Sequence, residues 1–232
     1  MADSAPYITL RKGEEDISDE ALVLRYRPGS ASLGVPPAAA LRYPDERPED
    51  RDHEGILYAR VTQSLNAAGR PVGQPIWPKV HPSRQRECMG EMLCHYCKGE
   101  PSHTAAGTLF LDVVGPEQRA KPDWPEGSFT FQPPLCLPHA KKAVDDCGHG
   151  HRHGGFTGLR VLEPRWHGVL GTPYQDSAGR PKATRTGAGR NTEVIPFNHP
   201  HKRLFLGTQY ALALHDVTVV DLAAEFAAAD LT

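Results

Sequence analysis

The stretch Cys94-His95-Tyr96-Cys97-Lys98-Gly99 is followed later in the chain by Cys136-Leu137-Pro138-His139. The first stretch contains a Cys-x-x-Cys pair and the second a Cys-x-x-His pair, so together they supply three thiolates and one imidazole. Such a set is typical of closed, tetrahedral zinc sites, whereas catalytic zinc usually keeps a position open. The sequence therefore predicts one structural Zn²⁺ bound by Cys94, Cys97, Cys136 and His139.

The segments around these pairs predict a short series of elements. Apolar residues at helical spacing indicate a helix over about 84–93, directly before the first pair. A strand is expected at 108–114, with 128–131 as its hairpin partner. Leu, Ala and Val spacing predicts a second helix from about 137 to 147, ended by Gly148. The expected order is knuckle, hairpin and helix.

This order resembles a treble-clef zinc finger. In that arrangement Cys136 and His139 stand on the first turn of the helix, where residues i and i+3 share one face. The expected fold class is α+β, a treble-clef-like finger embedded in a loop-rich body of short β-hairpins and few helices. Three regions are expected: a β-rich region with a Pro-rich loop at 1–80, the finger at 81–155, and C-terminal strands with a final helix at 156–232, packed with the finger as one domain.

Outside the finger, short apolar runs predict further strands. The segment 56–62 is expected to form a hairpin with 72–77, through a turn at Asn66-Ala67-Ala68-Gly69. The other strand candidates are 158–162, 166–170, 203–206 and 210–214. A final helix is expected to begin after a cap at Asp216 or Thr218 and to run through 221–226. The segment 174–192 is expected to form a mobile, basic loop.

Composition restricts the class of protein. The chain has 232 residues, 39% of them hydrophobic, with 22 Gly and 22 Pro, which favours a loop-rich body. A net charge of −2 gives no bulk support for binding to nucleic acid or a membrane, so a protein partner is expected. With no signal-peptide or transmembrane pattern, and with five Cys that suit a metal better than disulfides, the expected location is the cytoplasm.

A set of residues spread over about 80–220 is similar to that of uncharacterised actinobacterial, Streptomyces-type zinc-binding proteins. The matching residues are Met89, Met92, Cys94, Cys97, Trp124, Pro133, Pro134, Cys136, Cys147 and His149. The chain departs from this pattern with His139 in place of Cys and Gly148 in place of Pro. Because that family carries no assigned activity, the resemblance implies the fold and the zinc site alone.

A histidine run, His149, His151 and His153, alternates with Gly and Arg after the second helix. Imidazoles at this spacing can hold a second transition metal. They are also typical of an exposed loop at a helix C-terminus, where His is favoured by the helix dipole. The exposed loop is the expected interpretation, and a second metal site is the alternative.

The expected function is that of a zinc-stabilised binding or adaptor protein without catalysis. The alternative is a metal-dependent enzyme, either a diverged HNH-like nuclease or a tailoring enzyme that uses the histidine run. Cys136, His139, Lys141 and Lys142 resemble the helix of HNH nucleases. Between the two ligand pairs, however, the one histidine is His103, and no Asp-His pair stands there to activate water. No catalytic residue can be named from the sequence.

Overall fold

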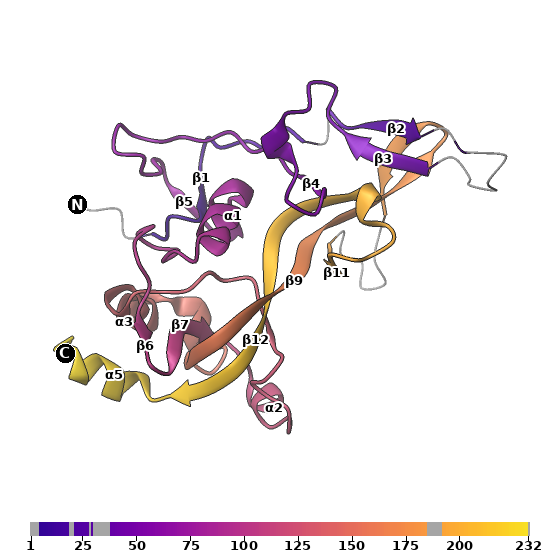
Figure 1. The fold of residues 1–232 in the computed structure, drawn as a ribbon. Coiled ribbons are helices and arrows are strands. Elements are labelled where there is room, and N and C mark those ends of the chain that lie inside the picture. Colours follow the sequence, from indigo (N-terminus) through magenta and orange to yellow (C-terminus); the bar gives the residue numbers. More distant parts are fainter. Residues whose placement is uncertain (1–4, 19–20, 28, 30–37, 185–191, 232) are drawn as a thin grey trace. The chain divides into compact units, whose positions relative to one another are not determined.

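The computed structural model describes residues 5–18, 21–27, 29, 38–184 and 192–231. It is an α+β protein, as predicted (Figure 1). The chain forms two compact units that are interleaved in sequence. Unit 1 comprises Met1–Thr9, Arg84–His167 and Ala211–Thr232, and unit 2 comprises Leu10–Ser83 and Gly168–Tyr210. The finger region therefore lies in unit 1 from Arg84 onward, whereas the flanking regions 1–80 and 156–232 each contribute to both units.

Unit 1 holds the helices and the finger. Its elements are α1 (Pro82–Gly90, which begins two residues before the unit), β6 (His103–Thr104), β7 (Gly107–Asp112), α2 (Pro116–Arg119), β8 (Phe129–Thr130), α3 (Leu137–Asp146), α4 (Gly148–Arg152) and α5 (Leu222–Ala228). Two long strands, β9 (Thr157–Ser177) and β12 (Phe205–Val220), give one part to each unit. The largest sheet has the order β4-β12-β9-β7-β6, and β8 is paired with β12.

Unit 2 consists of short strands and single helical turns. Its elements are β1 (Thr9–Arg11), β2 (Val23–Arg27), β3 (Ala38–Arg42), η2 (Pro48–Asp50), β4 (Leu57–Tyr58), β5 (Pro75–Val80), β10 (Arg180–Ala183), β11 (Glu193–Pro196) and η3 (Lys202–Leu204). Strand β2 pairs with β3, and β5 with β1. One cluster of buried residues in this unit comprises Leu22, Leu41, Tyr43, Leu57, Ala59 and Leu206.

The predicted pairing of 108–114 with 128–131 is wrong. Strand β7 instead forms a tight hairpin with β6, in which His103 lies opposite Thr108, and its other edge pairs with β9. Gly107 makes the tight turn possible, because its φ of +109° suits glycine and a Cβ there would lie 2.2 Å from the Val161 carbonyl oxygen. Strand β8 pairs with β12, where Phe129 lies opposite Ala213.

The second predicted hairpin, 56–62 with 72–77, is also wrong. Strand β4 pairs in parallel with β12, and β5 pairs with β1. The turn at 66–69 does form, with the Gly69 N–H donating to the Asn66 carbonyl over 2.9 Å. Around it a single bridge joins Leu65 and Pro71.

Helices were predicted more accurately than strands. The two finger helices occur as α1 and α3, with bounds that differ from the prediction by no more than three residues. The final helix is capped by Asp221, whose carboxylate accepts from the Ala223 and Ala224 N–H groups, and not by Asp216 or Thr218, because β12 continues through Val220. Gly148 does not end the helical region, since α4 begins there.

The remaining strand predictions merge or extend. The candidates 158–162 and 166–170 are parts of one strand, β9, and 210–214 lies within β12, which begins just after η3. Part of the predicted loop 174–192 is an antiparallel hairpin between the end of β9 and β10. The rest of that loop, 185–191, lies outside the described residues.

Candidate metal centre

The Cys94–Gly99 segment closes into a tight knuckle. The Cys94 N–H donates to the Gly99 carbonyl over 2.8 Å, and the Lys98 N–H donates to the Cys94 carbonyl over 2.7 Å. Lys98 has a left-handed φ of 57°, which turns the chain back on itself. A Cβ on Gly99 would lie 3.2 Å from the Cys97 sulfur. The knuckle thereby directs both thiols of the Cys-x-x-Cys pair to one side.

The second ligand pair stands on the first turn of α3, as predicted. Cys136 is the N-cap residue, with φ −78° and ψ 154°, and its carbonyl accepts the Ala140 N–H over 2.9 Å. Pro138 fits the first turn because its missing N–H would have no intrahelical partner there. His139 follows one turn after the cap, so its ring and the Cys136 thiol project to the same side.

The structure brings the four predicted ligands together. Their ligand atoms all lie within 4.8 Å of one another. With Zn–S bonds of about 2.3 Å, the edges of a tetrahedral thiolate site are about 3.8 Å long. The Cys136 sulfur lies 3.6 Å from that of Cys94 and 4.0 Å from that of Cys97. This group is therefore compatible with a zinc finger and could hold a metal ion.

The imidazole completes the same set. His139 Nδ1 lies 3.9 Å from the Cys94 sulfur and 3.0 Å from the Cys136 sulfur. The first distance is close to a tetrahedral edge, and the second is shorter, as expected for a direct hydrogen bond between the two groups. Cys94 is fully buried, and the other three ligands are half-buried.

The thiols share protons unequally. The pKa of the Cys94 thiol is lowered to about 4, first by its hydrogen bond with the Cys136 thiol, against the opposing effect of burial, and then by N–H groups of Cys136, Cys97 and Tyr96. The same sulfur–sulfur hydrogen bond and burial raise the pKa of Cys136. Burial raises the pKa of Cys97. A cation would displace the remaining protons, because thiolates are the form that binds metal.

Two aromatic residues inside the knuckle have different roles. His95 does not belong to the ligand group: it is buried and its Nδ1 lies 2.7 Å from the Pro133 carbonyl. Burial lowers the pKa of His95, which favours the neutral ring. Tyr96 stacks on His139, with ring centroids 5.2 Å apart and planes inclined by 15°. Sequence reasoning missed this stack, which orients the imidazole.

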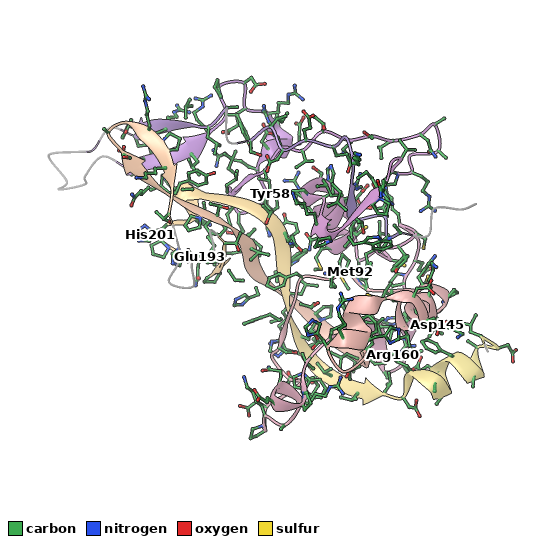
Figure 2. The ribbon with its side chains drawn as sticks, turned by 180° about the vertical axis from the view of Figure 1, so that it is seen from behind. Tyr58, Met92, Asp145, Arg160, Glu193 and His201 are labelled. Atoms are coloured by element: carbon green, nitrogen blue, oxygen red, sulfur yellow. The ribbon has the colours of Figure 1, made fainter. Side chains whose placement is uncertain are left out.

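A buried arginine ties the finger to the C-terminal helix. Arg160 on β9, labelled in Figure 2, is fully buried and forms an ion pair with Glu225 of α5. Its guanidinium also donates to the Ser102 carbonyl over 2.9 Å and to the Ser102 hydroxyl over 3.0 Å. Ser102 follows the knuckle directly, and its N–H donates to the Leu135 carbonyl just before the second ligand pair. Nothing in the local sequence distinguished Arg160 from a solvent-exposed strand residue.

Among the side chains that the structure describes, no second group of three His, Cys, Asp or Glu residues lies close enough to share an ion. His151, on the short helix α4, has its Nε2 3.2 Å from the carbonyl oxygen of Asp145 on α3. The His149 side chain lies outside the described set, so the predicted second site at 149–153 stays a prediction. The lysines of the HNH-like pattern form i,i+4 ion pairs, Lys141 with Asp145 and Lys142 with Asp146.

Comparisons with known proteins provide no further guide. No protein-family model, no curated protein and no solved structure matches the chain. Within the described part of the chain, no helix has the length and apolar character needed to cross a membrane. The function of the chain is therefore inferred from the geometry of the site.

Proposed function

We propose that this chain is a zinc-stabilised binding protein in which Zn²⁺ is a structural, non-catalytic ion held by Cys94, Cys97, Cys136 and His139. The observation that carries the proposal is the convergence of three thiols and one imidazole at near-tetrahedral spacing. Soft thiolates with one imidazole suit zinc far better than the hard cations Mg²⁺ or Ca²⁺.

Four protein ligands leave no open position on a tetrahedral ion. Catalytic zinc sites usually have three protein ligands and a water, so the donor count supports a structural role. The surrounding core supports it too. Cys94 belongs to a buried cluster of unit 1 in which the large, buried apolar residues among those described are Leu109, Leu111, Leu135 and Phe226, while the side chains around them are only partly buried. A bound ion would cross-link the knuckle, the hairpin and α3, where apolar burial is modest.

The hairpin gives little support to the nuclease alternative. Its second strand, β7, carries the buried apolar residues Leu109, Phe110 and Leu111 and no histidine. His103 is exposed on β6, and its Nδ1 lies 3.1 Å from the Thr108 hydroxyl. This arrangement favours a binding protein over an enzyme. The likeness to Streptomyces-type zinc-binding proteins and the cytoplasmic location are retained as parts of the same proposal.

Elemental analysis of the purified chain tests the proposal. We expect one zinc per chain in the wild type and in a Cys147→Ser control, and substantially less in Cys136→Ser. Replacement of zinc by Co²⁺ should give the intense visible bands of tetrahedral thiolate coordination. A wild-type protein that takes up no zinc, or Co²⁺ bands of octahedral coordination, would contradict the structural zinc site. Metal-dependent nicking of plasmid DNA that is lost in His103→Ala would contradict the non-catalytic role.

A further inference from the structure

The β2–β3 hairpin of unit 2 has two chemically different faces. Its register places Val23 opposite Arg42, Arg25 opposite Ala40 and Arg27 opposite Ala38. Directly opposed residues share one face of an antiparallel pair, and alternate residues share it along each strand. One face therefore consists of six residues: Val23, Arg25, Arg27, Ala38, Ala40 and Arg42.

The other face of the hairpin is packed inside unit 2. Leu41 is fully buried in the core of the unit, and Leu24 packs against the same cluster together with Tyr174 of β9. On this face the Tyr26 hydroxyl donates to Asp176 over 2.7 Å. The β2–β3 and β9–β10 hairpins thus contact each other through these residues. The face with the three arginines is turned away from that contact.

The outward face carries three arginines, two of which have no carboxylate partner among the described residues. Arg25 and Arg27 are exposed, and within the described part of the chain neither forms an ion pair. Arg42 donates through Nε to the Tyr43 carbonyl and lies near Glu46, whose pKa is lowered first by Arg51 and less by Arg42. The two strands contain no carboxylate, and the intervening sequence 28–37 carries no charge. The three guanidiniums are flanked by alanines that do not cover them.

We propose that this face binds the phosphate backbone of double-stranded DNA without sequence preference. Arg25 and Arg27 are two residues apart on one strand, about 6.8 Å, so their guanidiniums can reach neighbouring phosphates. Arginine presents a planar fork that binds phosphate oxygens in pairs. A flat face of arginine, alanine and valine has no amide or carboxylate side chain to read base edges, so contacts to phosphate dominate.

The chemistry of the face favours duplex DNA over other anions. Proteins that bind single strands stack bases on aromatic side chains, and this face has none. A duplex needs no such platform, because its bases are already stacked and its charge density is high, about one charge per 1.7 Å of axis. An acidic peptide presents separated carboxylates and a lower charge density, so it is the weaker ligand for three closely spaced arginines.

This proposal names the partner of the proposed zinc-stabilised binding protein, so it rests on the proposed binding function. The net charge of −2 disfavoured nucleic acid for the chain as a whole, but Arg25 and Arg27 are exposed and have no ion-pair partner among the described residues. The arginines belong to unit 2, whereas the metal ligands belong to unit 1. Loss of one property can therefore be measured without loss of the other.

The test is fluorescence anisotropy of a labelled 20-base-pair DNA duplex, titrated with full-length protein from 50 to 200 mM salt. Three phosphate contacts give a slope of log K against log salt of about −2.7, or roughly a 40-fold loss of affinity over this range. Arg25→Gln/Arg27→Gln should bind more weakly and lose only about 3- to 4-fold, since one contact remains. Zinc content should be unchanged in this variant, which separates the result from failure of the metal proposal.

The matched control is Arg180→Gln/Lys182→Gln. Arg180 and Lys182 are exposed, and in the strand register they lie opposite Ser177 and Gln175 of β9. They therefore point to the other face from Asp176, which accepts the hydrogen bond of Tyr26. The control removes the same charge from the adjoining hairpin, and we expect the wild-type slope. Equal weakening in both double variants, no duplex binding at 50 mM salt, or tighter binding of single-stranded DNA or polyglutamate would overturn the proposal.

Discussion

Replacement of one metal ligand, Cys136→Ser, should abolish the dependence of folding stability on zinc. Cys136 lies at the centre of the ligand group, because its sulfur is within 4.0 Å of the Cys94 and Cys97 sulfurs and within 3.0 Å of His139 Nδ1. A serine hydroxyl is a poor zinc ligand at neutral pH, since it stays protonated. The substitution nevertheless preserves side-chain shape and the N-cap position.

The magnitude follows from linkage between binding and folding. An ion that binds only the folded chain stabilises it by RT ln(1 + [Zn]/Kd), about 4 kcal/mol when free zinc is 1,000 times Kd. If the lost ligand weakens binding by about 1,000-fold, the same zinc concentration stabilises the variant by only about 0.4 kcal/mol. We therefore expect chelation to lower the unfolding free energy of the wild type by about 4 kcal/mol, and to leave the Cys136→Ser variant nearly unchanged.

Guanidinium unfolding followed by circular dichroism, with buffered free zinc or with a chelator, measures this difference. The control is Cys147→Ser, because Cys147 is a half-buried free thiol outside the ligand group. It should respond to zinc as the wild type does. If Cys136→Ser does not fold, Cys97→Ser serves as a second test of the same ligand group. The reasoning is refuted if chelation leaves the wild-type midpoint unchanged, or if both ligand variants respond to zinc fully.

Three further predictions concern unit 1. In the presence of a chelator, the free energy of unfolding should rise from about pH 4 to about pH 8.5, because the pKa of Cys94 is about 4 in the folded chain and that of an ordinary thiol in the unfolded chain. Urea midpoints measured over this pH range should show the rise, and Cys94→Ala should flatten it. Glu225→Ala should lower the free energy of unfolding by about 3 kcal/mol, because it leaves the buried Arg160 charge without its carboxylate. In a double-mutant cycle, the double variant Arg160→Met/Glu225→Ala should lose less free energy of unfolding than the two single variants together. Gly107→Ala should lower the melting temperature by several degrees more than Gly69→Ala, because both have positive φ but only Gly107 faces backbone at 2.2 Å; equal losses would contradict the steric argument.

The ligand group could be predicted because its geometry is almost entirely local. A Cys-x-x-Cys knuckle closes through hydrogen bonds within six residues, and Cys136 and His139 are related by one helical turn. Chemistry supplies the one non-local step, since four soft ligands in a chain are best satisfied by a shared ion. The contact that holds the His95 ring depends on a distant segment, because its Nδ1 lies 2.7 Å from the Pro133 carbonyl.

Strand pairing could not be predicted in the same way, because it depends on segments far apart in sequence. The segment 108–114 has the apolar pattern of a strand, but that pattern does not specify its neighbours. Strand β7 pairs with both β6 and β9, and β8 pairs with β12. Proximity in sequence favoured the wrong partner. The turn that β6 and β7 actually use requires Gly107, whose φ of +109° suits glycine.

The same limit explains why the cationic face was not found from the sequence. Arg25, Arg27 and Arg42 are separated by up to seventeen positions, and only the β2–β3 register places them on one face. Lys141 and Lys142, which resemble the lysines of the HNH-nuclease helix, are neutralised one helical turn away by Asp145 and Asp146. A net charge sums such neutralised and unopposed cations alike. The pairing of strands and the i,i+4 geometry of helices separate them, so local electrostatics here follows from secondary structure and not from composition.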